Sequence, residues 1–109
     1  MATLHSFDPA TGASIGEVPI TPPEEVQAAV DRARKAQPAW AALGLDGRAR
    51  ILEQAAAVLE ERAEKHAELI TREQGKPLKE SRVEAKSLGA GLGREVEEMV
   101  EALQPEVLE

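Results

Sequence analysis

Cysteine and tyrosine are absent from this chain of 109 residues, and it has only one phenylalanine, Phe7, and one tryptophan, Trp40. A chain without cysteine has no disulfide, no thiolate metal ligand and no thiol nucleophile. No apolar run approaches the roughly 18–20 residues that cross a bilayer. The N-terminus also lacks the charged and apolar stretches of a signal peptide. These absences lead us to expect a cytoplasmic protein with no membrane partner.

Positive charge is scarce as well. Lysine and arginine number 13 against 20 aspartates and glutamates, which gives a net charge of −7. The densest basic cluster is Arg32-Ala33-Arg34-Lys35. Nucleic acids and anionic membrane surfaces are both recognised by larger basic faces. We therefore expect no nucleic-acid partner.

Large apolar side chains are fewer than the hydrophobic content of 42% implies, because 19 of the 46 apolar residues are alanines. A free-standing domain of this size should bury roughly two-thirds of its unfolded surface. Alanine contributes little area to such a core. The composition therefore predicts either a marginal helical protein or a chain that depends on a further partner surface.

The first twenty residues predict a β-hairpin over about 4–19. Apolar and polar residues alternate in two short runs, and Asp8-Pro9-Ala10-Thr11-Gly12 between them has the residues of a turn. An isolated hairpin is marginal in water. Its apolar side chains Leu4, Ile15 and Val18 are expected to need a partner surface.

Three helices are predicted to follow, over about 22–40, 46–74 and 77–103. For the first, we expect a capping box from Thr21 and Glu24, and a kink or an end by Gln37 because of Pro38. The connection should run from Ala41 to Gly47. The second helix is long enough to kink near Glu64, and Gly75 should end it.

The third predicted helix contains Gly89, Gly91 and Gly93 near its middle. Each glycine costs about 1 kcal/mol against alanine in a helix interior, so tertiary packing must hold the segment or it breaks. Val107 and Leu108 at the C-terminus are left with nothing to pack on. The fold class is thus mainly α with a short N-terminal β-hairpin.

Local motifs predict no active site, and we assign no catalytic, cofactor-binding or metal residue. Gly89-Ala90-Gly91-Leu92-Gly93 has the composition of a phosphate loop but follows a helical pattern rather than a strand, which favours a close helix–helix approach or a kink. His5 and His66 lack metal-ligand spacing, and His66 is expected to be a packed core or edge residue. Lys76 beside Gly75 is expected to stabilise the C-terminus of the helix by capping it and by interacting with the helix dipole.

Several short segments stand in a characteristic order over roughly residues 6 to 84: Phe7-Asp8-Pro9-Ala10-Thr11-Gly12, Ile15-Gly16-Glu17-Val18-Pro19, Glu24-Glu25-Val26-Gln27-Ala28-Ala29-Val30, Ala33-Arg34-Lys35-Ala36-Gln37-Pro38-Ala39-Trp40, Arg48-Ala49-Arg50-Ile51-Leu52, Leu59-Glu60-Glu61-Arg62 and Glu68-Leu69-Ile70-Thr71-Arg72-Glu73-Gln74-Gly75-Lys76-Pro77-Leu78. Their order and spacing resemble the start of the NAD(P)-dependent aldehyde dehydrogenases. Beyond Ala85 the agreement weakens at the three glycines.

That resemblance implies an N-terminal piece of the α/β aldehyde dehydrogenase fold, with residues 1–109 forming a single partial domain. In the family, a cysteine thiolate attacks the aldehyde, hydride passes to NAD or NADP, and a glutamate activates water. The Rossmann core and the catalytic domain that carry these steps would lie downstream. This chain is therefore expected to bind no cofactor and to be inactive alone, although its full-length parent would oxidise an aldehyde to a carboxylate.

The resemblance also implies a possible ligand. Some family members bind a monovalent cation through positions that match the backbones near Ser6 and Phe7 and a carboxylate near Glu84. The acidic position matches after a shift of one residue. The helical faces would pack on the rest of the dehydrogenase, with Trp40 as the largest anchor.

A second hypothesis remains open beside the first. The chain is then a complete, non-enzymatic relative that self-associates, or docks on a full-length dehydrogenase, through its apolar helical faces. A discrete, cooperatively melting oligomer favours this hypothesis, whereas an aggregating or molten monomer favours the first.

Overall fold

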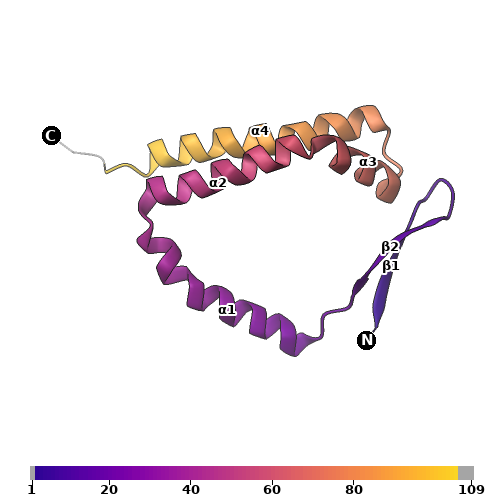
Figure 1. The fold of residues 1–109 in the computed structure, drawn as a ribbon, viewed down its shortest axis with the longest axis horizontal. Helices are drawn as coiled ribbons and strands as arrows, with labels where there is room; N and C mark the ends of the chain where they lie inside the picture. Colours follow the sequence, from indigo (N-terminus) through magenta and orange to yellow (C-terminus); the bar gives the residue numbers. More distant parts are fainter. Residues whose placement is uncertain (1, 106–109) are drawn as a thin grey trace.

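The computed structural model describes residues 2–105, which form a two-stranded hairpin followed by four helices (Figure 1). The strands are β1, Thr3–Phe7, and β2, Ser14–Pro19. The helices are α1, Pro23–Ala42; α2, Gly44–Glu61; α3, Ala63–Gln74; and α4, Leu78–Ala102. The mainly helical class with a short hairpin is confirmed. Val107 and Leu108 lie outside the described residues.

The hairpin forms where the sequence predicts it, with β1 and β2 antiparallel and Leu4 opposite Val18. Asp8 organises the turn, because its carboxylate accepts hydrogen bonds from the backbone N–H of Ala10 at 2.8 Å and of Thr11 at 3.2 Å. Gly12 takes the left-handed conformation at φ +72° that the turn requires. The turn is therefore specified by local sequence alone.

Helix α1 corrects two expectations. It continues through Pro38 to Ala42, so proline does not end it by Gln37. Only one backbone hydrogen bond is lost at Pro38, and the alanines around Trp40 that follow are good helix formers. The capping box is also wrong. Pro22 is the N-cap, no side chain caps the helix, and the carbonyl of Pro22 accepts from the N–H groups of Glu25 and Val26.

The predicted helix over 46–74 is two helices. The break falls at Arg62, which leaves helical geometry at φ −97° and ψ 6°, two residues before the expected kink at Glu64. The connection predicted from Ala41 to Gly47 shrinks to Leu43, because Gly44 at φ +69° already starts α2 and Gly47 lies within it. Gly75 ends α3 in the left-handed conformation, as expected. The apolar pattern that predicts one long helix therefore extends over two helices, which are joined by a single residue.

Helix α4 packs antiparallel along α2 and α3 and forms the only extensive helix–helix contact within residues 2–105 (Figure 1). The seam is made of small residues. On α2 and α3 the buried side chains are all alanines, and α4 contributes Ser81, Ala85, Gly89 and Val96. Small side chains let the helix backbones approach closely, which is why α4 runs unbroken through its three glycines. The close-approach interpretation of Gly89 is confirmed.

The molecule is open rather than compact. Its Cα radius of gyration is 18.8 Å, against about 13 Å for a compact domain of this length. Figure 1 shows α1 diverging from α2 at one corner and the hairpin lying beside α3 at the other, so that these elements surround an open centre. In α1 every side chain is exposed except that of Trp40, which is half-buried. The core is therefore confined to the seam between α4 and the pair α2 and α3.

Candidate functional site

One hydrogen bond joins the hairpin to α3. The hydroxyl Oγ of Ser6 donates a hydrogen bond to Oε1 of Glu73 at 3.3 Å. Beside this contact, the apolar side chains expected to need a partner stay largely uncovered, with Leu4 62% and Val18 56% exposed. They border a hollow of about 460 Å³, lined by Leu4, Ile15, Val18 and Leu69 with Ser6 and Glu73. The hairpin thus rests on α3 through one hydrogen bond and a loosely filled apolar contact.

A second hollow, of about 520 Å³, lies between α3 and α4. His66, Leu69, Ile70, Glu73, Glu84 and Leu88 are among the residues that line it. His66 is half-buried there, which confirms it as an edge residue, whereas exposed His5 lies 3.5 Å from the carboxylate of Glu17 on the hairpin. Across residues 2–105 no group of three or more histidine and acidic side chains is placed to hold a metal ion.

Of the residues that the family resemblance associates with a monovalent cation, Glu84 and the hydroxyl of Ser6 make side-chain contacts within the chain. The ammonium of Lys76 donates to the carboxylate of Glu84, and Ser6 donates to Glu73. Lys76, which follows the end of α3, therefore also forms an ion pair with Glu84 of α4. A cation near Glu84 would have to compete with an ammonium group that neutralises it. Cation binding at Ser6, Phe7 and Glu84 stays a prediction.

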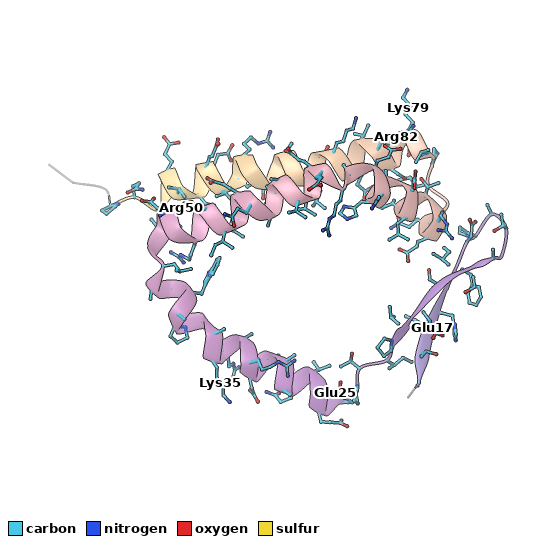
Figure 2. All side chains as sticks on the ribbon, viewed as in Figure 1. Glu17, Glu25, Lys35, Arg50, Lys79 and Arg82 are labelled. Atoms are coloured by element: carbon cyan, nitrogen blue, oxygen red, sulfur yellow. The ribbon has the colours of Figure 1, made fainter. Side chains whose placement is uncertain are left out.

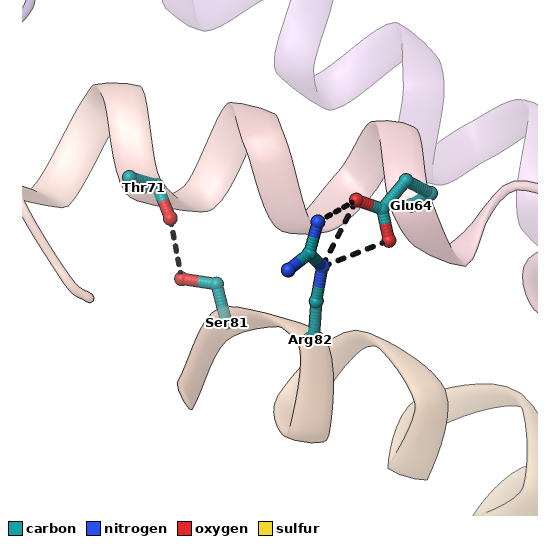
Figure 3. A network of polar contacts seen from close by, with 4 residues as sticks. All are labelled: Glu64, Thr71, Ser81 and Arg82. Atoms are coloured by element: carbon teal, nitrogen blue, oxygen red, sulfur yellow. Dashed lines mark hydrogen bonds and ion pairs between the residues drawn. The ribbon is translucent and has the colours of Figure 1, made fainter. Parts of the chain in front are cut away.

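Two side-chain contacts bind α3 to α4 (Figure 3). The hydroxyl of Thr71 donates to that of Ser81 at 2.9 Å, and Ser81 is fully buried. The guanidinium of Arg82 donates from Nη2 to Oε1 of Glu64 at 2.6 Å and from Nε to both carboxylate oxygens. These hydrogen bonds hold the pKa of Glu64 below its ordinary value and raise the pKa of Arg82. The sequence analysis missed both pairs, because no local spacing signals partners on separate helices.

The glycine-rich segment does not fit the phosphates of NAD or NADP. Phosphate binding needs a helix N-terminus whose free N–H groups point at the anion. Gly89, Gly91 and Gly93 instead lie in the interior of α4, where the backbone N–H groups are used by the helix. Gly89 also faces α2 so closely that an added Cβ would lie 2.9 Å from the backbone nitrogen of Glu60. The described residues therefore offer no dinucleotide site here.

The most distinctive surface is the one that borders the open centre. In Figure 2, Lys35 points away from the centre on the outer side of α1. At 100° per residue, Val26, Val30 and Ala33 lie within about 40° of the opposite direction. Val26 is 51% exposed and Val30 is 42% exposed. An apolar side of α1 thus faces the centre without a partner.

Helix α2 presents a matching surface from the other side. Ala49 and Ala56 are buried against α4, and Ile51 and Val58 follow each of them by two residues, or about 200° of helix rotation. Ile51 and Val58 therefore lie on the side of α2 away from α4, which Figure 1 shows facing the centre. Both are more than 40% exposed. We call Val26, Val30, Ala33, Ile51 and Val58 the inner face.

Trp40 closes the corner between α1 and α2. It borders a hollow of about 170 Å³ with Leu52, Val96, Met99 and Leu103 among its other lining residues. The indole is half-buried rather than enclosed. Trp40 therefore borders this corner without being enclosed, and its role as an anchor on the rest of a dehydrogenase stays a prediction.

Comparison with known proteins gives one consistent result. The model of the family described as "Aldehyde dehydrogenase family" matches residues 2–109. N-succinylglutamate 5-semialdehyde dehydrogenase of Burkholderia mallei (strain SAVP1) is 45% identical over 85 residues, covering 78% of this chain and 18% of the relative. Betaine aldehyde dehydrogenase of Sinorhizobium fredii is 39% identical over 87 residues, covering 80% and 18%. The chain spans less than a fifth of the length of these relatives.

Proposed function

The chain belongs to the aldehyde dehydrogenase family and corresponds to its N-terminal region; from this premise we propose that it is the structural N-terminal segment of an NAD(P)-dependent aldehyde dehydrogenase. The full-length parent would oxidise an aldehyde to a carboxylate. The segment itself would be catalytically inactive and would act by packing against the rest of the enzyme.

Inactivity of the segment is supported by its own residues. Oxidation through a covalent intermediate needs an activated nucleophile, and the sequence contains no cysteine. The glycine-rich segment lies inside a helix instead of at a helix N-terminus. We therefore derive no catalytic step from this chain, and we place NAD or NADP binding in the full-length enzyme.

The structural role is supported by the inner face. Val30 and Val58 lie on separate helices, face the open centre and are both 42% exposed. Large exposed apolar surfaces on soluble proteins mark contacts with other chains or domains. The partner in this proposal is the remainder of a dehydrogenase, in the cytoplasm. Within residues 2–105, no helix is both long and apolar enough to span a bilayer.

Two experiments test this proposal. Sequencing the transcript past the codon for Glu109 should find an open frame that encodes a cysteine-bearing segment, and a stop codon there would contradict the structural-segment role. The purified 109-residue chain should also fail to oxidise N-succinylglutamate 5-semialdehyde or betaine aldehyde with NAD or NADP. Turnover measured by the absorbance of the reduced nicotinamide would overturn the inactivity, because it needs a nucleophile that the chain lacks.

A chimera tests the packing itself. The chain replaces the N-terminal region of the Burkholderia relative, and we expect the chimera to retain dehydrogenase activity. Val58→Glu on the inner face should abolish assembly of that chimera, because it buries an unpaired carboxylate. Val83→Glu is the matched control, because Val83 is 63% exposed on α4 and lies on the side turned away from the seam. Equal loss in both variants would argue against the inner face as the packing surface.

The exposed inner face also favours a second function, that of a complete and non-enzymatic helical module that assembles with itself or with another protein. Its apolar residues would then be covered without a parent enzyme. A stop codon directly after Glu109 would support this alternative.

A further inference from the structure

We propose that Gly44 is a single-residue conformational switch between two arrangements of α1 and α2. In the bent form, which is the one described above, the two helices meet at a corner. In the continuous form, residues 23–61 make one uninterrupted helix. This inference concerns the chain itself and does not rest on the proposed structural role in a longer enzyme.

The backbone of the two forms differs at one position. Gly44 has a φ of +69°, and no other residue between Pro23 and Glu61 has a positive φ. Leu43, which lies between the helices, already has right-handed helical angles, with φ −65° and ψ −16°. Glycine adopts left-handed and right-handed conformations about equally readily. A change of Gly44 to the right-handed conformation would therefore join α1 to α2.

Backbone hydrogen bonding favours the continuous form. The last four carbonyl groups and the first four N–H groups of a helix have no partner within that helix. At this joint no side chain caps the start of α2, and the last turn of α1 contains no basic residue. The N–H of Leu43 reaches only as far as the carbonyl of Trp40, at 3.3 Å. In the continuous form, the free N–H groups of α2 would pair with the free carbonyl groups of α1.

Trp40 favours the bent form. Its indole is half-buried in the corner, where Val96 and Met99 of α4 also border the hollow. Ala49 lies on the side of α2 that packs on α4. In a continuous helix, Trp40 and Ala49 would lie about 180° apart at 100° per residue, so the indole would leave the hollow and point away from α4. Indole burial and backbone hydrogen bonds thus oppose each other at this joint, as a bistable element requires.

Gly47 gives an independent sign that the bend depends on missing side chains. In the bent form a Cβ on Gly47 would lie 3.0 Å from Cβ of Leu43. In an uninterrupted helix, Cβ atoms four residues apart are separated by about 5–6 Å. A side chain at position 47 would therefore crowd the bent form alone. A Cβ on Gly44 meets nothing within 4 Å, so a side chain there acts only through the backbone conformation.

A distance measurement on the full chain tests the switch. The chain has no native cysteine, so spin labels can be attached at Ala28→Cys and Ala57→Cys, two exposed positions on α1 and α2. The continuous form places these positions about 44 Å apart, and the bent form places them closer. By double electron–electron resonance, we expect the shorter distance to dominate in the parent chain. Gly44→Ala should enlarge the population near about 44 Å at least about fivefold, because alanine disfavours the left-handed conformation.

Gly47→Ala and Trp40→Ala should enlarge the same population for independent reasons, the first by crowding the bend and the second by removing the indole from the corner. In Gly44→Ala, the fluorescence emission of Trp40 should move to longer wavelength. Gly91→Ala is the control, because it also replaces a helical glycine but its Cβ meets nothing within 4 Å. It should leave the distance distribution and the emission unchanged.

A distribution that stays short in both glycine variants of the joint overturns the proposal. A distribution that broadens without a peak near about 44 Å also overturns it, because it shows a loose joint instead of two states. Circular dichroism of the same samples should show helix content that is kept or raised. A loss of helix content in the variants with the longer distance would mean unfolding at the joint and would contradict the continuous form.

Discussion

At the scale of single residues, the seam between α2 and α4 depends on the absence of one side chain. A Cβ on Gly89 would lie 2.5 Å from Cγ of Glu60, 2.9 Å from its backbone nitrogen and 3.1 Å from the carbonyl oxygen of Ala56. Two of these three atoms belong to the backbone, so rotation of a side chain cannot relieve the clash. Glycine is required here for packing, although it lowers helix propensity.

We therefore predict that Gly89→Ala lowers the free energy of unfolding by about 1–3 kcal/mol, as overpacking does elsewhere. Gly91→Ala is the control in the same helix, because a Cβ there meets nothing within 4 Å. It should raise stability by about 1 kcal/mol through helix propensity. Urea unfolding followed by circular dichroism measures both. Similar values for the two variants would contradict the packing role of Gly89.

The contact between Glu64 and Arg82 predicts a pH effect with a definite sign. The pKa of Glu64 is lowered chiefly by its hydrogen bond with Arg82, so the folded state favours the ionised carboxylate. This stabilisation is present above the unfolded-state pKa of about 4.3 and is lost as the pH falls through the lower folded-state pKa. Both side chains are about half exposed, which keeps the contribution small.

Arg82→Gln should return the pKa of Glu64 towards its ordinary value, and NMR titration of the carboxyl carbon measures it. The variant should also lose less stability than the parent between about pH 6 and about pH 3. Lys79→Gln removes the same charge from an exposed position one turn earlier on α4, and it should leave the titration of Glu64 unchanged. An unaltered pKa in Arg82→Gln would contradict the assignment.

At the scale of elements, the hairpin and α3 meet where the left-handed end of the helix lies beside the proline of the hairpin turn. Gly75 ends α3 at φ +71°, and a Cβ on it would lie 3.1 Å from Cγ of Pro9 in the hairpin turn. Ser6 and Glu73 make the hydrogen bond beside it. A side chain at position 75 would therefore force Pro9 to shift by a few tenths of an ångström, in addition to straining the left-handed helix end.

Gly75→Ala should accordingly release the hairpin as well as strain the end of α3. We expect faster amide hydrogen exchange in β1 and β2, together with a loss of about 1–2 kcal/mol from the left-handed conformation. Gly44→Ala carries the same strain, because its φ is +69°, but its Cβ would meet nothing within 4 Å. It should leave exchange in the hairpin unchanged. Hairpin exchange that rises equally in both variants would contradict the contact with Pro9.

At the scale of the whole molecule, stability is distributed unevenly. The seam contains all the buried side chains of the described residues, whereas α1 contains none. Segments with few buried contacts open locally, and core segments exchange through larger unfolding events. We expect α1 to exchange faster than the region of α4 around Val96 in dilute protein.

Hydrogen exchange with peptide-level mass spectrometry measures this difference in dilute protein. Equal protection of α1 and α4 in dilute protein would contradict the uneven distribution of stability.

Local sequence by itself determined the elements whose causes lie within a few residues. The turn around Asp8 and Gly12, the helix end at Gly75 and the periodic apolar positions of the helices are of this kind, because side-chain hydrogen bonds and permitted φ angles act over short separations. The sequence also determined the family, through the order of its motifs, and it determined that no cysteine nucleophile is present.

Tertiary structure alone decided features that depend on residues far apart. Glycine is needed at position 89 of α4 because Ala56 and Glu60 lie against it. The pairing of Glu64 with Arg82 requires α3 and α4 to lie side by side. Helix α1 passes through Pro38 despite the local signal, and Leu43 with Gly44 holds α1 away from α2. The inner face follows from that geometry, because periodicity shows which residues share a face of a helix, whereas only packing decides which face is left uncovered.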